Sequence, residues 1–341
     1  MLRSLPYLLP SDNGKSERIL FIRYSALGDI LLATPYARAL KEKFPDCHLT
    51  WLAACPYEQL LEGQPYIDGI LQWDRSLDNG AFFRLIREIR KKRFTRIVSL
   101  QGTDRGALMA LLSGVPQRFC ESGKWMPVYN PGTSDFWKTH DIKAPETPGK
   151  GYAATKKMLD CASALLDPVK QPFVLAAIGA SKEVKQWPVS RWAEFVKEAC
   201  AREIPVVLAG DGVEERRKSE EIVKASPSPF LHNLVGRIPL FALGGAVTKA
   251  ALVIAGDTGI LNMARIMGVP SIALLGPTPL PGGVGLMKPE QVFVSECGKA
   301  GCGKTDCREN CLESIESAEV FRAVRRVWNR TSIGNSTQNG S

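Results

Sequence analysis

Short, largely apolar runs alternate with helical periodicity in the first half of the chain. Such runs are typical of buried strands, whereas apolar residues that recur every three or four positions indicate a helix packed by one face. The predicted strands cover residues 19–22, 49–52, 97–100 and the region around 119. The predicted helices cover residues 30–44, 82–89 and a short segment that carries Leu108, Leu111 and Leu112. Residues 126–151 are rich in proline and glycine, which predicts an irregular loop.

The same alternation starts again in the second half, after a helix predicted at residues 152–166 and a linker at 167–172. Further strands are predicted at 173–178, 206–209, near 234, 252–255 and 271–275, with helices at 191–202, after 214, from 239 and at 260–267. Strands that alternate with helices in two rounds indicate an α/β protein with two Rossmann-like parallel-sheet domains that face a cleft. We expect domains at 1–166 and 167–330, followed by a polar, disordered tail at 331–341.

Composition narrows the class of protein. With 45% hydrophobic and 23% charged residues, the 341-residue chain is neither fibrous nor disordered. It carries no apolar run of the roughly 20 residues that span a bilayer, so we expect a cytoplasmic protein. The formal net charge of +9 favours acidic partners, such as phosphates, nucleic acid or an anionic leaflet.

The most informative loop is the segment 255–259, Ala-Gly-Asp-Thr-Gly, which lies between a predicted strand and a helix. The first amides of a helix carry no internal hydrogen bond and a partial positive charge, so small residues there let a diphosphate approach. Thr258 adds a hydroxyl donor. The alternative is a tight turn in which Asp257 and Thr258 only cap the helix.

Two other loops of the second half carry charges at the carboxyl ends of predicted strands, where open α/β sheets bind ligands. Lys182 and Lys185 precede Trp187, and either ammonium could reach a phosphate. Glu214 and Glu215 follow a strand, as do carboxylates that bind ribose hydroxyls. The alternatives are solvated lysines, and acidic residues that favour a helix N-terminus.

The corresponding loop of the first half, residues 25–29, is Ser-Ala-Leu-Gly-Asp. It is not the G-x-G-x-x-G pattern of dinucleotide-binding folds, which disfavours a nicotinamide enzyme. Asp29 could take a proton from an acceptor hydroxyl as a general base. The alternative is that Asp29 caps the helix that follows.

A cluster of cysteines marks the C-terminal part of the chain. Four of the nine cysteines lie within fifteen residues, at Cys297, Cys302, Cys307 and Cys311. In a reducing compartment such a set indicates a structural zinc or iron site. The alternative is four free thiols in a surface loop.

Taken in order, these loops resemble the heptosyltransferases of lipopolysaccharide inner-core synthesis, the ADP-heptose-dependent glycosyltransferase family 9 with a GT-B fold. The resemblance covers nearly the whole chain. It rests on residues 18–29 with Thr34-Pro35, 100–105, 185–188 with Trp192, 256–259, 268–270 and 276–278. Cysteine-rich tails similar to this one occur in some members of the family.

The resemblance implies inverting transfer of a heptose from ADP-heptose to a hydroxyl of the lipopolysaccharide inner core, with no cofactor or metal in catalysis. It implies that the first domain binds the acceptor and the second the nucleotide sugar. Asp29 matches the general base of the family. The residues that match its donor site are Lys185, Glu214, Glu215, Asp257, Thr258, Gly259 and Asn262. The family usually has a histidine where this chain has Asn262, and an amide donates hydrogen bonds but does not titrate near neutrality.

An acidic acceptor suits the basic helix face at residues 84–96, which is otherwise an ordinary solvated face. We expect an anionic lipid-linked oligosaccharide as acceptor, contacted by Ser25 and Arg105, and a peripheral position on the cytoplasmic face of the inner membrane. We expect no nucleic-acid partner. Three alternatives stay open: a related transferase that uses another nucleotide sugar or a protein acceptor, a GT-B sugar-nucleotide epimerase, and a catalytically inactive binding module.

Overall fold

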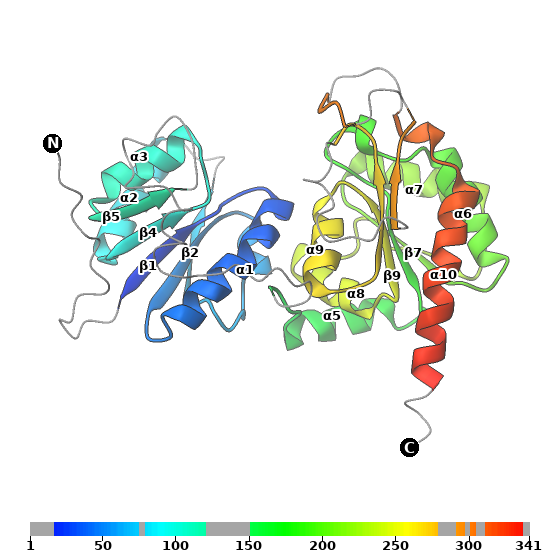
Figure 1. Ribbon diagram of the computed structural model, residues 1–341, viewed down its shortest axis with the longest axis horizontal. Coiled ribbons are helices and arrows are strands. Elements are labelled where there is room, and N and C mark those ends of the chain that lie inside the picture. Colours follow the sequence, from blue (N-terminus) through cyan, green and yellow to red (C-terminus); the bar gives the residue numbers. More distant parts are fainter. Residues whose placement is uncertain are drawn as a thin grey trace. The chain divides into compact units, whose positions relative to one another are not determined.

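The structure, a computed structural model, describes residues 17–74, 79–120, 151–278, 291–296, 301–304 and 311–336. The chain divides into two compact units, Met1–Pro145 and Glu146–Ser341. Each unit contains one parallel sheet with helices on both faces (Figure 1), which confirms the predicted α/β class. Within the described ranges, no helix is both long and apolar enough to cross a membrane.

The first unit has a five-stranded parallel sheet in the order β3-β2-β1-β4-β5. Its strands are β1 (Arg18–Ile22), β2 (His48–Ala54), β3 (Gly69–Trp73), β4 (Arg96–Ser99) and β5 (Gln117–Cys120). Its helices are α1 (Leu27–Lys43), α2 (Asn79–Lys91) and α3 (Asp104–Ser113), with a short 3₁₀ helix η1 (Tyr57–Leu60). Strand β1 is central and pairs in parallel with β4. The loops after these two strands are therefore neighbours at the carboxyl ends of the strands.

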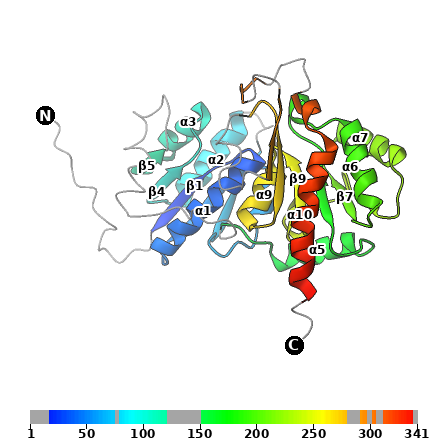
Figure 2. The ribbon, with the colours of Figure 1, turned by 45° about the vertical axis from the view of Figure 1, so that its right-hand side comes forward.

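Successive side chains of β1 point to opposite faces of the sheet and supply two separate cores. Ile19 and Phe21 pack in the core beneath α1, whereas Leu20 and Ile22 pack in the core beneath α2 and α3. Figure 2 shows α1 on one side of this sheet and α2 and α3 on the other. The central strand is therefore apolar at every one of these positions, as its sequence predicts.

Helix α1 contains Pro35, which cannot donate the helical hydrogen bond to the carbonyl of Leu31. The hydroxyl of Thr34 donates to that carbonyl oxygen instead, at 2.6 Å. The Thr34-Pro35 pair is thus tolerated inside a continuous helix because the threonine satisfies the acceptor that the proline leaves without a partner.

The second unit has a six-stranded parallel sheet in the order β11-β10-β9-β6-β7-β8. Its strands are β6 (Val174–Ala177), β7 (Val206–Ala209), β8 (Leu231–Asn233), β9 (Leu252–Gly256), β10 (Ser271–Leu275) and β11 (Val292–Val294). Its helices are α5 (Lys156–Leu166), α6 (Val189–Cys200), α7 (Val213–Ala225), α8 (Leu243–Lys249), α9 (Gly259–Met267) and α10 (Ser317–Ser336). The 3₁₀ helices are η3 (Glu183–Lys185), η4 (Leu240–Ala242) and η6 (Cys311–Ser314).

Helices α6, α7 and α10 pack together against one face of this sheet, and α5, α8 and α9 pack together against the other. Phe195 of α6 contacts Phe321 of α10, with ring centroids 6.3 Å apart. Helix α5 lies so close to α8 that a Cβ atom at Gly245 would be 2.2 Å from the carbonyl oxygen of Met158. Glycine is therefore required at this crossing.

Several boundaries differ from the predicted ones. The units divide between Pro145 and Glu146, not at residue 166, because α5 packs on α8 of the second unit. Residues 331–336 continue α10 and are helical, since extending an existing helix adds a hydrogen bond for each residue. Strands β3 and β11 and helix α10 were not predicted. The loop predicted at 126–151 lies almost entirely outside the described residues.

The basic helix face also needs a correction at one end. Arg96 lies in β4 with its side chain 2% exposed, and it pairs with Glu17 at 3.0 Å. Burial lowers the pKa of this guanidinium, and the charge of Glu17 opposes that change. Arg96 is therefore a buried structural residue, and only the residues of α2 and the turn after it form the basic surface.

Candidate functional site

Asp29 lies in the first turn of α1, just after the carboxyl end of the central strand. Its Oδ2 atom is 2.7 Å from Nη2 of Arg23 and accepts a hydrogen bond from the backbone N–H of Ala26 at 3.2 Å. The carboxylate thus binds the N-cap amide from the third position of the helix. The alternative expected from the sequence, with Asp29 itself as the N-cap, is wrong because the helix begins before it, at Leu27. Its side chain is nevertheless 48% exposed, and both contacts use the same oxygen. Oδ1 takes part in neither of these two contacts.

The position of Arg23 is set by groups from two neighbouring strands. The indole Nε1 of Trp51, a fully buried side chain of β2, donates to the carbonyl oxygen of Arg23 at 2.8 Å. The Arg23 guanidinium also donates to the carbonyl oxygen of Leu100, after β4. Arg23 was not predicted from the sequence. It orients Asp29 because its backbone and its side chain are both held in place.

The loops after β1 and β4 are joined by Tyr24. Its hydroxyl forms a hydrogen bond with Thr103, and its backbone N–H donates to Oε1 of Gln101 at 3.4 Å. Thr103 is the N-cap of α3, the helix whose second residue is the exposed Arg105. The structure therefore brings Ser25, Asp29 and Arg105, the three residues predicted for acceptor and base, to adjacent loops at the same edge of one sheet.

In the second unit, Lys185 and Asp257 form an ion pair although they are far apart in the sequence. The Nζ atom of Lys185 is 2.7 Å from Oδ2 of Asp257, and the hydroxyl of Thr278 donates to the same oxygen at 2.8 Å. The side chains of Lys185 and Asp257 are only 20% and 22% exposed. Three of the loops that the sequence singled out, after β6, β9 and β10, thus meet at one point.

Gly256 explains how these loops come so close. A Cβ atom at this position would be 2.7 Å from the carbonyl oxygen of Lys185, so any other residue would push η3 away from β9. The glycine has no left-handed backbone requirement here. It is needed because two backbone segments touch.

Thr258 is the N-cap of α9, and its hydroxyl does not form the usual capping bond. The Oγ1 atom is buried and has no hydrogen-bond partner among the described residues. An unsatisfied buried hydroxyl is costly, about 1–3 kcal/mol, and points to a partner that the protein itself does not supply. The first amides of α9, from Gly259 onward, lie beside it. Together they are hydrogen-bond donors of the kind that bind anions at helix N-termini.

Asn262 lies one turn into α9, where its side chain is oriented by Arg265. The Nη1 atom of Arg265 donates to Oδ1 of Asn262 at 3.2 Å. Because the amide oxygen faces the arginine, the amide NH₂ faces the other way, where it is a donor. Burial lowers the pKa of Arg265, and the nearby charge of Asp257 opposes that change. Arg265 was not predicted from the sequence, although its spacing of three residues from Asn262 on a helix was a usable signal.

The structure separates the two glutamates that the sequence left as alternatives. Glu214 is exposed and pairs with Arg217 at 3.2 Å. Glu215 folds over the ends of β6 and β7, where its carboxylate would overlap a Cβ atom at Gly179 or Gly210. It accepts the backbone N–H of Asp211 at 2.7 Å, and burial raises its pKa above the usual value. Of the two, only Glu215 lies against the carboxyl ends of β6 and β7.

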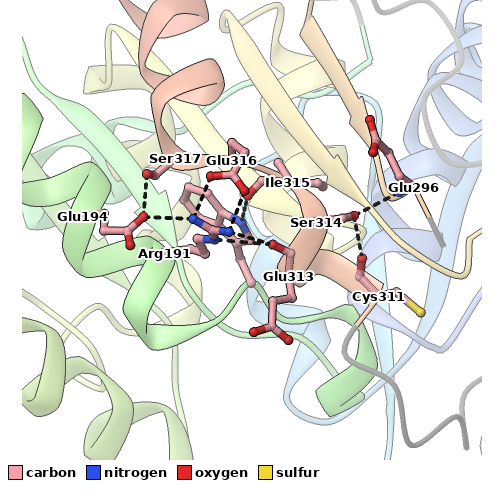
Figure 3. A network of polar contacts seen from close by, with 10 residues as sticks. Arg191, Glu194, Glu296, Cys311, Glu313, Ser314, Ile315, Glu316 and Ser317 are labelled. Atoms are coloured by element: carbon pink, nitrogen blue, oxygen red, sulfur yellow. Dashed lines mark hydrogen bonds and ion pairs between the residues drawn. The ribbon is translucent and has the colours of Figure 1, made fainter.

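The segment after Lys185 is anchored by the turn between η6 and α10. Figure 3 shows the Arg191 guanidinium between the carboxylates of Glu194 and Glu316, with Nη2 of Arg191 2.6 Å from Oε1 of Glu316. The indole of Trp187 donates to the carbonyl oxygen of Ile315 at 3.0 Å. These contacts fix the start of α6 and so restrain the turn that carries Lys185.

Two of the four clustered cysteines, Cys297 and Cys307, lie outside the described residues. Cys311 is buried and Cys302 is exposed. The segments that carry these two cysteines lie close to the end of β10. The amide of Gly303 donates to the carbonyl oxygen of Pro277 at 2.7 Å, and a Cβ atom at Gly276 would be 3.1 Å from Cβ of Cys311. In the part of the chain that the structure describes, no three histidine, cysteine or acidic side chains gather as metal ligands.

The sequence profile described as glycosyltransferase family 9 (heptosyltransferase) matches residues 133–313, more than half of the 341-residue chain. Among curated proteins, the chain is 21% identical over 337 residues to lipopolysaccharide heptosyltransferase 1 of Pseudomonas aeruginosa. That alignment covers 90% of this chain and 92% of the relative.

Solved structures share the fold. The family 9 glycosyl transferase of Veillonella parvula superposes with a TM-score of 0.78 and 19% identity, covering 91% of this chain and 97% of that one. The Escherichia coli heptosyltransferase WaaC, solved with ADP-2-deoxy-2-fluoro heptose, gives a TM-score of 0.70 at 15% identity, covering 91% and 99%. These likenesses confirm the predicted fold of two parallel-sheet domains.

Proposed function

Because the chain belongs to glycosyltransferase family 9, the heptosyltransferase family, we propose that it moves a heptose from ADP-heptose to a hydroxyl of the lipopolysaccharide inner core. The donor is suggested by the E. coli structure with an ADP-heptose analogue, and the acceptor by the P. aeruginosa relative. The observation that carries the proposal is the unsatisfied Thr258 hydroxyl at the start of α9, close to the Lys185–Asp257 pair.

The donor diphosphate would bind at the N-terminus of α9. Backbone amides from Gly259 onward, the Thr258 hydroxyl and the NH₂ group of Asn262 are all donors, and Lys185 adds a positive charge. Negative charge builds up on the diphosphate as it leaves, so fixed donors at this point stabilise the transition state more than the ground state. The donors are held in place before substrate arrives.

The Lys185–Asp257 pair suggests how the donor site could bind both the diphosphate and the heptose. A diphosphate carries more negative charge than one carboxylate, so Lys185 would turn to the phosphates when the donor binds. Asp257 would keep its hydrogen bond from Thr278 and accept hydroxyls of the heptose. Glu215, at the ends of β6 and β7, would accept the ribose hydroxyls.

We assign general-base catalysis to Asp29. Its carboxylate would accept the proton of the acceptor hydroxyl as the hydroxyl oxygen attacks the anomeric carbon. The new bond joins that oxygen to the anomeric carbon, while the bond from the anomeric carbon to the phosphate oxygen breaks and ADP leaves with its electron pair. Attack from the face opposite ADP inverts the anomeric centre. This step requires no metal.

On the acceptor side we propose Ser25, which lies just before α1, and Arg105, which follows the neighbouring strand β4. Arg105 is exposed at the start of α3 and suits a phosphate or carboxylate of an anionic, lipid-linked oligosaccharide. Such an acceptor would bring the protein to the cytoplasmic face of the inner membrane as a peripheral protein. Nucleic acid is not among the proposed partners.

A structural zinc or iron at the four clustered cysteines is a separate proposal. The amide of Glu296 donates to the hydroxyl of Ser314 at 2.9 Å, so the segments that flank the cluster meet. Metal analysis of the purified protein, alongside a Cys302→Ser/Cys311→Ser variant, tests it. We expect metal in the wild type and less in the variant, and a metal-free wild type would contradict the proposal.

The experiment for the function is incubation of the purified protein with ADP-heptose and a truncated core lipid. We expect ADP release together with an acceptor that is heavier by one heptose, whose anomeric configuration, measured by NMR, is opposite to that of the donor. Isomerised donor without product would favour an epimerase, and retention of configuration would contradict the mechanism.

A further inference from the structure

Helix α3 has its large apolar side chains on the outside. Its buried positions hold mainly small residues, among them Gly106, Ala107 and Ala110. Leu108 and Leu111 are 45% and 51% exposed instead. Their spacing is that of a core stripe, but the small residues face the sheet. Leucines on the outer face of a three-layer α/β/α unit need another explanation than packing within the unit.

The neighbouring helix α2 extends this exposed apolar surface. Phe83 of α2 is 60% exposed, the highest exposed fraction of any aromatic side chain among the described residues. The guanidinium of Arg90 donates to the carbonyl oxygen of Leu112 at 2.7 Å, which joins α2 to α3. Figures 1 and 2 show the two helices side by side on the same face of the first sheet. We call Phe83, Leu108, Leu111 and the charged side chains around them the α2–α3 surface.

The charges on the α2–α3 surface are mostly positive. On α2, Phe83, Arg87 and Arg90 share one stripe at helical spacing. The exposed basic residues of the two helices are Arg84, Arg87, Arg90, Lys91 and Arg105, and the exposed acidic ones are Glu88 and Asp104. Apolar side chains set among arginines fit the headgroup region of an anionic leaflet. There the apolar side chains contact the acyl boundary and the arginines contact the anionic headgroups.

The remaining large apolar side chains recorded as exposed are single and elsewhere. Leu32 lies on α1, which covers the opposite face of the first sheet, and Val213 lies on α7 of the second unit. Single exposed apolar residues are normal and carry no inference. The three on α2 and α3 are distinguished by being grouped and by being surrounded by cations.

We propose that the α2–α3 surface docks on an anionic phospholipid leaflet and thereby presents lipid-linked acceptor to Asp29. This inference rests on the proposed function for the identity of the acceptor. Arg105, at the N-terminal end of α3, adjoins the acceptor loops, and Leu111 is six residues further along, about 9 Å down the helix. Helix α3 therefore leads from the leaflet to the acceptor site, so the acyl chains stay in the leaflet while the sugar reaches the base.

The first test measures binding of the full-length protein to vesicles of phosphatidylcholine, with and without phosphatidylglycerol, by flotation. We expect binding only with the anionic lipid. A Phe83→Ser/Leu108→Ser/Leu111→Ser variant should bind at least about tenfold more weakly, since it loses apolar contact with the leaflet. The matched control is Leu32→Ser/Val213→Ser, which removes exposed apolar side chains elsewhere and should bind like the wild type.

A second pair of variants tests the charge. Arg84→Gln/Arg87→Gln should weaken partitioning into anionic vesicles about thirtyfold. Each cation near such a surface contributes about the same favourable binding free energy, and this variant loses two of them. Lys197→Gln/Lys224→Gln makes the same change in net charge on the second unit and should have little effect. Equal losses in both pairs would mean that only net charge matters, and would overturn the assignment of the surface.

Activity assays separate this inference from the proposed function. The apolar triple variant should lose transfer to acceptor embedded in vesicles but keep transfer to the delipidated oligosaccharide. Loss of both would place these residues in the acceptor site and overturn the docking role.

Sedimentation without lipid completes the test. A wild type that self-associates and a triple variant that does not would show that the surface joins two copies, which also overturns the docking role. If the wild type binds vesicles but transfers to neither acceptor, the proposed function fails while docking stands.

Discussion

The dipeptide Gly-Asp follows a parallel strand in both units, and the two aspartates have different surroundings. Asp29 is 48% exposed and pairs with Arg23. Asp257 is 22% exposed and is held by Lys185 and Thr278. Both lie at the carboxyl edge of a central strand. The same short sequence therefore produces a half-exposed carboxylate paired with an arginine in one unit, and a largely buried carboxylate held by a lysine and a threonine in the other.

The difference comes from where each helix begins. Helix α1 begins at Leu27, before Asp29, so the carboxylate turns back and binds the amide of Ala26. Helix α9 begins at Gly259, after Asp257, so its first amides and the Thr258 hydroxyl are left for something else. A shift of a few residues in helix start thus distinguishes a candidate base from a candidate anion site.

The sharpest test of this contrast is Asp29→Asn. An asparagine can still accept the Ala26 amide, but it cannot take a proton, so kcat should fall by about 10²- to 10⁴-fold. Affinity for ADP, measured by calorimetry, should stay within about twofold of the wild type, because the donor residues are untouched. Turnover near that of the wild type would remove Asp29 from the proposed role.

Lys185→Ala should act on the other unit. Losing the only ammonium that contacts Asp257 in the described structure should weaken ADP binding about 100-fold, the size of a lost charge-assisted contact. Lys182→Ala is the matched control, since Lys182 is an exposed lysine in the same turn. If both variants bind ADP equally, the Lys185–Asp257 pair is structural and has no role in donor binding.

Asn262→Asp sharpens the account at the start of α9. The new carboxylate would keep the contact with Arg265 but place a negative charge where an amide donor was. We expect ADP binding to weaken about tenfold through repulsion of the diphosphate. Asn262→His should bind better than Asn262→Asp because an imidazole can donate. An aspartate variant with wild-type affinity would contradict the position of the phosphates.

The smallest expected effect is in thermal stability. Burial raises the pKa of Glu215 in the folded protein above its ordinary value of 4.5. The stabilisation that comes from the protonated side chain is therefore present below pH 4.5 and is lost as the pH rises through the raised pKa. Glu215→Gln should therefore melt at the same temperature as the wild type near pH 4, and at most about 2–4 °C higher at pH 7. Glu214→Gln, at an exposed site, should show no such pH dependence. A Glu215→Gln variant less stable at pH 7 than at pH 4, relative to the wild type, would contradict this.

Much of the fold follows from the sequence because fully buried strands are short apolar runs. The strands predicted at 206–209 and 271–275 coincide with β7 and β10. Strand β3 was missed because its sequence Gly-Ile-Leu-Gln-Trp is neither alternating nor continuous. Periodicity identified α3 but not its orientation, since a stripe of leucines does not tell which side faces the sheet. That fact became visible only when Ala107 and Ala110 were found beneath it.

The candidate site was predictable as loops but not as contacts. Lys185 and Asp257 were both singled out, yet their pairing depends on β6 lying next to β9, a topology that no local pattern contains. Arg23 and Arg265 were missed because their functions are defined by neighbours, Asp29 in one case and Asn262 in the other. Residues that position another residue leave little trace in a single sequence.

The most direct test of the central claim is a crystal structure of the full chain with ADP-heptose. We expect a diphosphate within hydrogen-bond distance of the Thr258 hydroxyl and the Gly259 amide, with Nζ of Lys185 on a phosphate oxygen and no longer on Asp257. A nucleotide bound away from the start of α9, or a Lys185 side chain still paired with Asp257 beside bound donor, would contradict it.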